Sequence, residues 1–185
     1  MSVSLSVVTG LDHPIFLESV RLIREQLGET SLNPLQQSVL ERLIHSSGDL
    51  TLAPALMFSK DACEEAIVAL KAGACILTDT AMAAAAVLPM AQRTLQTTVH
   101  TLLEWAPETS PPGSTRSAMG MERSWSALAT QIPAPVVLIG SAPTAMELLL
   151  DLVQAGAKAP SLIIGMPVGF VGVAESKRRL AASGL

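Results

Sequence analysis

The sequence predicts an α/β fold in which a mainly parallel sheet is flanked by helices. Apolar runs of strand length lie at 136–139 and 162–164, and segments with helical spacing of apolar residues stand before, between and after them. In such folds the loops that follow the strands gather at one edge of the sheet, where ligands bind. At 185 residues, the chain is expected to form a single domain, 1–185.

Three helices are predicted in the first part of the chain. Apolar residues recur near helical spacing over Pro14–Leu27. Asn33 offers a capping side chain directly before a proline, which predicts a second helix over Pro34–Ile44 that ends near Gly48. The third should run from about Asp61 to Leu70.

The next segment predicts a short strand and then a loop region. Ala74–Leu77 is an apolar run that ends at the polar pair Thr78-Asp79. No long periodicity covers Val87–Trp105, and Glu108–Ser114 is dense in turn-forming residues. We therefore expect irregular structure through the middle of the chain.

The C-terminal part predicts two strand-loop-helix units in tandem. A helix over 116–130 precedes the buried strand Val136–Ile139, and a helix over 144–154 separates it from the strand Leu162–Ile164. A glycine-rich loop at 166–172 and a terminal helix follow. The two strands should be parallel neighbours.

Composition excludes several function classes. A net charge of −4 with scattered basic residues argues against nucleic-acid binding, and 3% aromatic residues with no tyrosine predict an aliphatic core. No apolar stretch reaches the roughly 20 residues that a membrane helix needs. Met1–Leu5 lacks the features of a signal peptide, so a cytoplasmic protein is expected. Cys63 and Cys75 are interpreted as buried free thiols.

Signatures of cofactor and metal sites are missing from the sequence. The glycines of 165–172 have the wrong spacing for a dinucleotide fingerprint, which makes a Rossmann-type dehydrogenase a weak alternative, and ordinary turn chemistry explains this string equally well. His13, His45 and His100 form no paired ligand motif, so neither a bound metal nor a cofactor is expected. Asp49 and Asp79 are interpreted as caps or turns.

Two places carry candidate chemistry. His45 falls at the end of an amphipathic helix, where the helix dipole favours the imidazolium and Arg42 opposes it. A lone histidine is more often structural. Thr115-Arg116-Ser117 follows a proline-rich loop and can offer a guanidinium and two hydroxyls to a carboxylate, although solvated loop residues remain an equal alternative.

Five strings of the sequence are distinctive when taken together. They are Arg42–His45 (RLIH), Leu70–Met82 with its glycine and Thr78-Asp79, Thr115–Ala118 (TRSA), Gly140–Ala145 (GSAPTA) and Ile164–Lys177 (IGMPVGFVGVAESK). In this order and at these intervals they resemble the precorrin-8X methylmutase family. The resemblance runs from about His13 to Leu180. It implies a Rossmann-like three-layer domain that acts as a homodimer. It also implies that the protein moves a methyl group from carbon eleven to carbon twelve of a tetrapyrrole in cobalamin biosynthesis, without a redox cofactor.

The resemblance also implies roles for individual residues. His45 corresponds to the family's catalytic histidine, which would protonate the macrocycle and ease a sigmatropic migration. The residues expected to bind the substrate and its peripheral carboxylates are Ser19, Arg42, Thr115, Arg116, Ser117, Ser141, Ala142, Pro143, Thr144, Gly169, Phe170, Val171 and Gly172.

The sequence departs from the family pattern in two respects. Ser114 and Ser141 stand where the family has asparagines, and the family continues beyond the terminal helix with a further strand, a GRxGGS-type segment and a helix. A chain that stops at Leu185 is expected to expose core or dimer surface. Two hypotheses stay open: an active methylmutase on metal-free or cobalt-bearing substrate, or a shortened relative that binds a corrinoid or serves in assembly.

Overall fold

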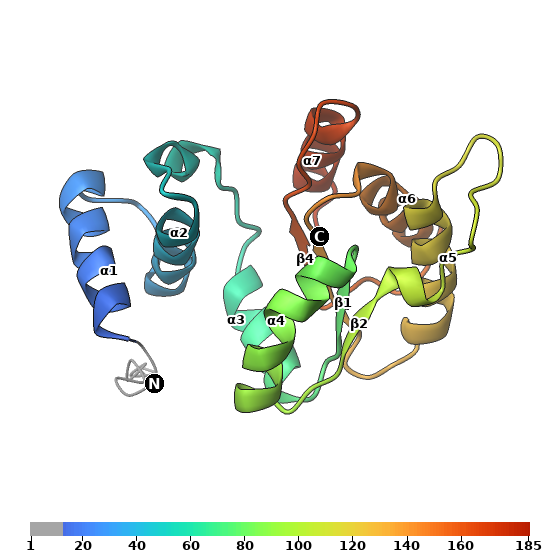
Figure 1. Cartoon of the computed structure of the whole chain (residues 1–185), viewed down its shortest axis with the longest axis horizontal. Helices are drawn as coiled ribbons and strands as arrows, with labels where there is room; N and C mark the ends of the chain where they lie inside the picture. Colours follow the sequence, from blue (N-terminus) through green and yellow to red (C-terminus); the bar gives the residue numbers. More distant parts are fainter. Residues whose placement is uncertain (1–12) are drawn as a thin grey trace. The chain divides into compact units, whose positions relative to one another are not determined.

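The computed structural model describes residues 13–185 and divides into two compact units, Met1–Phe58 and Ser59–Leu185 (Figure 1). Met1–Leu5, from which the absence of a signal peptide was predicted, lies outside the described residues. The single domain expected for the whole chain stays a prediction. Within residues 13–185, no helix is long and apolar enough to cross a bilayer.

The first unit is a pair of helices followed by a short 3-10 helix. Helix α1 (Pro14–Leu27) and helix α2 (Pro34–Ser47) confirm the two predicted helices, and η1 (Leu50–Ala55) follows. Asn33 and Gln36 form a reciprocal capping box at the start of α2, which satisfies amide hydrogens that the helix leaves unpaired. A small apolar core joins the three elements; it contains Ile23, Leu40 and Ile44, with Leu27, Leu32, Leu50, Ala53 and Leu56 packed around them.

The second unit is built on a parallel sheet. The strands β1 (Ile76–Thr78), β2 (Val99–Thr101), β3 (Val136–Ile139) and β4 (Leu162–Gly165) lie in the order β2-β1-β3-β4. All three strand pairs are parallel, which confirms that β3 and β4 are parallel neighbours. Strand β2 lies on one side of β1, at the edge of the sheet, whereas β3 and β4 lie on the other side of β1. The direction in which strands are added to the sheet therefore reverses after β2. A reversal of this kind marks the place where open α/β sheets bind ligands.

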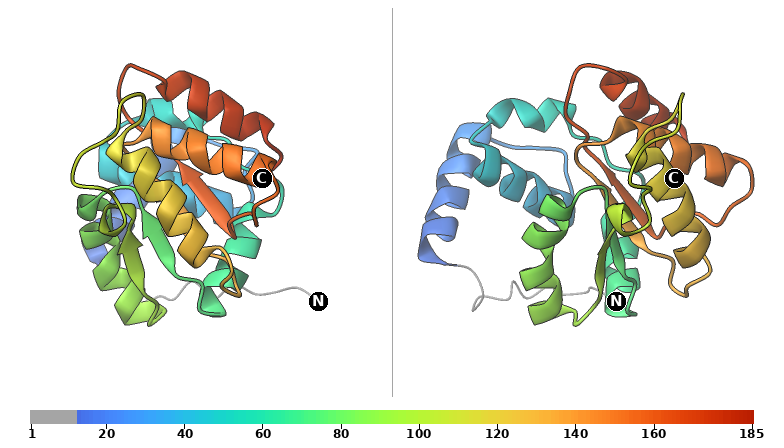
Figure 2. Two further views of the ribbon diagram at one scale, coloured as in Figure 1. Left: turned by 90° about the vertical axis from the view of Figure 1, so that its right-hand side faces the viewer. Right: turned by 45° about the vertical axis from the view of Figure 1, so that its right-hand side comes forward.

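Helices cover both faces of this sheet, as the three-layer prediction requires. Figures 1 and 2 show α3 (Ala62–Lys71) and α4 (Ala81–Thr94) on one face, with α5 (Arg116–Leu128) and α6 (Pro143–Gln154) on the other. Helix α7 (Val173–Ala182) packs against α6. Successive side chains of each strand point to opposite faces of the sheet and so can pack against both helical layers.

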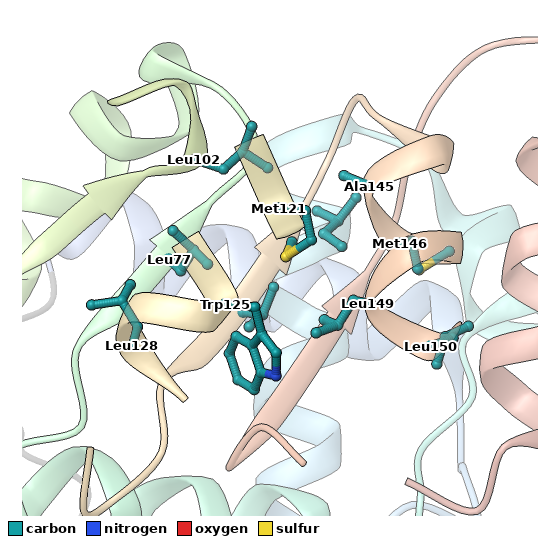
Figure 3. Packing of buried hydrophobic residues seen from close by; sticks show 11 residues of the cluster. Leu77, Leu102, Met121, Trp125, Leu128, Ala145, Met146, Leu149 and Leu150 are labelled. Carbon is teal, nitrogen blue, oxygen red and sulfur yellow. The ribbon is translucent and has the colours of Figure 1, made fainter. Parts of the chain in front are cut away.

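The main core lies between the sheet and the α5–α6 layer (Figure 3). Leu77, Val137 and Leu149 are fully buried there, as an aliphatic core predicts. Trp125 is the exception: it is 1% exposed in the middle of the cluster, and its indole N–H donates to the carbonyl oxygen of Lys158 at 3.2 Å. An indole can be buried at this position because its polar atom has a partner.

Two sequence interpretations need correction. Helix α4, strand β2 and the short η2 (Leu102–Glu104) occupy part of the segment that was expected to be irregular. Only Ala91 of α4 is buried, so this alanine-rich helix has no apolar stripe from which to recognise it. Of the two free thiols Cys75 is buried, but Cys63 is only half-buried.

Candidate active site

His45 is presented by the last turn of α2. Gly48 ends the helix in the left-handed conformation, with φ of 70°, and its N–H donates to the carbonyl oxygen of Ile44 at 2.8 Å. The ring nitrogen Nδ1 of His45 lies 2.7 Å from the hydroxyl oxygen of Ser19 on α1. The His45 side chain is exposed but fixed through Nδ1, which leaves Nε2 as the nitrogen able to meet a substrate.

An aromatic ring and a guanidinium lie beside this pair. The ring of Phe16 meets the imidazole of His45 edge-on, with centroids 5.0 Å apart, and the guanidinium carbon of Arg42 lies 4.4 Å from the centroid of the same Phe16 ring. Phe16 precedes Ser19 by three residues and so shares its face of α1. We missed Phe16 in the sequence, although this spacing from Ser19 was a usable signal.

His45 and Ser19 border an open hollow of ≈ 220 Å³. The rest of its wall comes from α1, the end of α2 and the start of η1: Leu22, Ile23, Gln26, Ile44, Gly48 and Leu50. The wall thus mixes apolar side chains with three polar groups: the Ser19 hydroxyl, the His45 imidazole and the Gln26 amide. Such a lining suits a ligand that has both apolar and polar parts and needs one proton-transferring group.

A buried carboxylate holds α1 against α2 beneath this hollow. Glu41 is 3% exposed and accepts hydrogen bonds from Arg24 Nε at 2.7 Å, Arg24 Nη2 at 3.0 Å and Gln37 Nε2 at 2.9 Å. The hydrogen bond to Glu41 raises the pKa of Arg24. Because Ser19 and His45 sit on these two helices, the Arg24–Glu41 pair helps to fix their separation.

In the second unit, the loops after β3 and β4 lie against each other at the carboxyl edge of the sheet. The N–H of Met166 donates to the carbonyl oxygen of Ile139 at 2.9 Å, and that of Val168 to Gly140 at 3.2 Å. A side chain at Gly172 would come within 3.7 Å of Pro143. The structure therefore brings the GSAPTA and glycine-rich strings together, as expected for loops that follow neighbouring parallel strands.

The amide groups of the GSAPTA loop are already engaged. Asp79, directly after β1, accepts the backbone N–H groups of Gly140, Ser141 and Ala142 through Oδ2 at 3.1, 2.6 and 2.8 Å. Without Asp79, these amides would be free to donate to the carboxylates of a substrate. What remains available to a substrate is the exposed Ser141 side chain. Asp79 was interpreted as a cap or turn, and its reach to a loop 61 residues away has no signal in the sequence.

The TRSA string lies beside the same loop. The hydroxyl oxygens of Thr115 and Thr144 are 2.8 Å apart, and Thr115 caps α5 by accepting from the Ala118 N–H at 3.0 Å. Arg116 is exposed and donates from Nε to the carbonyl oxygen of Pro107 at 2.8 Å. This contact fixes the inner part of the guanidinium and leaves its outer nitrogens to face a ligand.

The glycine-rich loop presents apolar side chains to solvent. Phe170 and Val171 are 103% and 89% exposed, next to Gly169 with φ of 133° and Gly172 with φ of 72°. Two neighbouring apolar side chains that lie open in this way commonly mark a binding surface. No three His, Cys, Asp or Glu side chains within residues 13–185 gather as metal ligands.

A family model described as precorrin-8X methylmutase matches residues 14–185. The chain belongs to the precorrin-8X methylmutase family. A cobalt-precorrin-8 methylmutase of Synechocystis sp. is 33% identical over 92% of this chain and 83% of its own. A precorrin-8X methylmutase of Pseudomonas aeruginosa is 38% identical over 91% and 80%.

The family assignment extends to a solved structure. The precorrin-8X methylmutase of Thermus thermophilus superposes with a TM-score of 0.77 at 33% identity, covering 90% of this chain and 80% of that one. The resemblance noted in the sequence is therefore confirmed at the level of family and fold. The roles of individual residues remain to be argued from the geometry.

Proposed function

We propose that this protein is an isomerase that moves a methyl group from carbon eleven to carbon twelve of precorrin-8X or its cobalt-bearing counterpart. The family assignment supports this reaction, and the placement of His45 carries the argument within the molecule. Its imidazole is exposed, is hydrogen-bonded at Nδ1 to Ser19 and borders the hollow. A general acid requires this combination of a fixed ring and one nitrogen open to the substrate.

The proposed reaction requires few other chemical groups from the protein. One carbon–carbon bond breaks and another forms within the same molecule, so the migration needs no oxidant, reductant or methyl acceptor. The conjugated macrocycle supplies the electrons that move. His45 gives a proton to the macrocycle to favour the migration and takes a proton back from the rearranged ring, so that substrate and product contain the same atoms. A metal ion and a redox cofactor have no step to perform in this proposal.

Polar side chains are proposed to bind the substituents at the edge of the macrocycle, and apolar side chains are proposed to contact the face of its ring. Arg116, Thr115 and Ser117 are proposed to hold peripheral acetate and propionate groups, because charge-assisted hydrogen bonds to a guanidinium are strong and directional. Phe170 and Val171 offer apolar surface to the macrocycle. The remaining residues proposed to line the substrate are Ser19, Arg42, Ser141, Ala142, Pro143, Thr144, Gly169 and Gly172.

A cytoplasmic homodimer is the proposed form of the enzyme. The aliphatic composition and the exposed apolar side chains of the second unit that the substrate proposal does not use, such as Met82 at 79% and Ile132 at 91%, support an apolar interface. Sedimentation should give a dimer at micromolar concentration. A stable monomer there would remove the dimer from the proposal.

The decisive experiment replaces His45 with asparagine and follows the absorption spectrum of precorrin-8X. Turnover should fall by about 10²–10⁴-fold, as for the loss of a general acid, while product affinity and melting temperature stay near those of the parent protein. His100→Asn is the matched control, since His100 lies on β2 and makes its own contacts with Glu104 and Trp105.

Three results would contradict the proposal in different ways. Wild-type turnover in His45→Asn would remove the acid role. An early melt with lost binding would assign His45 a structural role. A parent protein that binds the product corrinoid but never converts either precursor would be a non-catalytic relative.

A further inference from the structure

The buried carboxylate of Asp79 stands at the point where the sheet reverses its strand order. Asp79 follows β1 and is 1% exposed. Its own N–H donates to the carbonyl oxygen of Leu138 on β3 at 3.1 Å, and its Oδ2 reaches the loop after β3. The residue therefore ties the ends of the two central strands together.

Both the charge and the hydrogen-bonding capacity of Asp79 are directed at the start of α6. Three consecutive amides, of Gly140, Ser141 and Ala142, converge on the single atom Oδ2. The other carboxylate oxygen, Oδ1, is buried and has no partner among the described residues. A helix N-terminus ordinarily attracts an anion from solution, because its amides and dipole favour negative charge. Here the chain supplies that anion itself.

We propose that Asp79 is a positioning residue: an internal anion that shapes the 140–142 loop and, through it, aligns the substrate-binding side chains of α6 and α5. The first link is covalent, since the loop leads directly into Pro143 and Thr144 at the start of α6. The second is the 2.8 Å contact between the hydroxyls of Thr144 and Thr115. Thr115 caps α5, whose first residues are Arg116 and Ser117.

This inference rests on the proposed function for its effect on catalysis, but not for its effect on the fold. The amides of residues 140–142, which precede α6, cannot bind a substrate carboxylate while they donate to Asp79. Anion recognition then depends on side chains such as Arg116, and Asp79 determines where they stand. Asp79 itself is 1% exposed and has no direct role in the reaction.

The experiment compares Asp79→Ala and Asp79→Asn with Asp61→Asn. Asparagine keeps an oxygen that can accept the amides but removes the charge, whereas alanine removes both. Asp61 is a matched control, because it precedes α3 in the same unit and its side chain makes no capping hydrogen bond. Each variant is melted in buffered sodium formate and in sodium chloride of equal ionic strength, and its kcat and KM are measured.

For Asp79→Ala we expect a fall of roughly 5–10 °C in melting temperature, because three amides lose their acceptor. KM should rise about tenfold while kcat changes less than about threefold, since binding groups are displaced and the acid is untouched. Asp79→Asn should recover at least half of both losses. Formate should raise the melting temperature of Asp79→Ala alone, by filling the vacated anion position.

The proposal fails if Asp79→Ala melts like the parent protein. It also fails if the melting temperature falls while KM stays unchanged, because Asp79 would then serve the fold only. Equal damage in Asp79→Asn and Asp79→Ala, with no effect of formate, would exclude the amide clamp as the cause. If the parent protein shows no turnover, the proposed function is wrong. The melting temperatures and the effect of formate would still test whether Asp79 acts as the internal anion of the 140–142 loop.

Discussion

Ser19 and His45 lie on different helices, and their side chains meet with 2.7 Å between the hydroxyl oxygen and Nδ1. This contact decides which nitrogen of the imidazole can serve a substrate. A hydroxyl can donate to Nδ1 or accept from it, so Ser19 can hold the orientation of the ring both before and after His45 gives up a proton at Nε2. Ser19 was expected to bind substrate, and the contact with Nδ1 suggests a second role, which is to orient the His45 ring.

Ser19→Ala should lower kcat by about tenfold and change KM by less than about threefold, because the ring loses its orientation while the hollow keeps its shape. Ser46→Ala is the control: Ser46 follows His45 directly, but its hydroxyl donates to the carbonyl oxygen of Arg42. Steady-state kinetics on both variants make the comparison. Equal rates in the two variants would show that Ser19 does not orient His45.

The parts of the fold that the sequence predicted are those with strong local signals. Helix α1 has apolar residues at helical spacing, α2 begins with a proline after the capping residue Asn33, and β3 is an unbroken apolar run, so their types and positions could be predicted. Helix α4 was missed because it is apolar nearly all round and mostly exposed. Strand β2 has three half-buried residues, too few for any alternation to register.

The candidate site divides in the same way. Motif strings singled out His45 and Arg116 because each has a distinctive residue type within a recognisable pattern. The Asp79 clamp and the Glu41 pair depend on contacts across 61 and 17 residues, which only the folded chain creates. Their residue types alone suggest nothing beyond a cap and a surface charge.

Glu41→Ala should destabilise the protein by about 1–2 kcal/mol, because it removes a buried acceptor and leaves Arg24 and Gln37 to water. Urea denaturation measures this, and Glu18→Ala provides the control, since Glu18 pairs with Arg21 at the surface and its loss should change little. The kcat of Glu41→Ala should fall as well, as α1 and α2 lose their fixed spacing. Unchanged stability in both variants would contradict the role given to the pair.

Arg116→Ala should raise KM by about tenfold with little change in kcat, because a guanidinium that holds a carboxylate contributes to binding alone. Arg116→Lys should recover only part of this loss, since an ammonium keeps the charge but not the fork. Arg93→Ala removes a similar exposed charge from α4 and serves as control. If KM rises equally in Arg116→Ala and Arg93→Ala, the effect would come from general electrostatic attraction and not from a specific contact of Arg116.

Gly120→Ala tests whether helix preference or close packing prevails in α5. Alanine in a helix interior is favoured over glycine by roughly 1 kcal/mol, which by itself would stabilise the protein. A Cβ at Gly120, however, would lie 2.6 Å from the backbone carbonyl oxygen of Leu102 and 2.8 Å from Cδ1 of the same residue. A backbone atom of a fully buried residue cannot move aside as a flexible side chain can, so the clash should prevail with a net loss of about 1–3 kcal/mol.

Gly140→Ala is the matched control for this packing test. Gly140 has open space where its Cβ would stand, and alanine keeps the N–H that donates to Asp79. The urea concentration at the midpoint of unfolding should therefore differ from that of the parent protein far less for Gly140→Ala than for Gly120→Ala. A Gly120→Ala protein as stable as the parent would mean that α5 and η2 can separate at little cost, and the position of Arg116 at the start of α5 would then be adjustable rather than fixed.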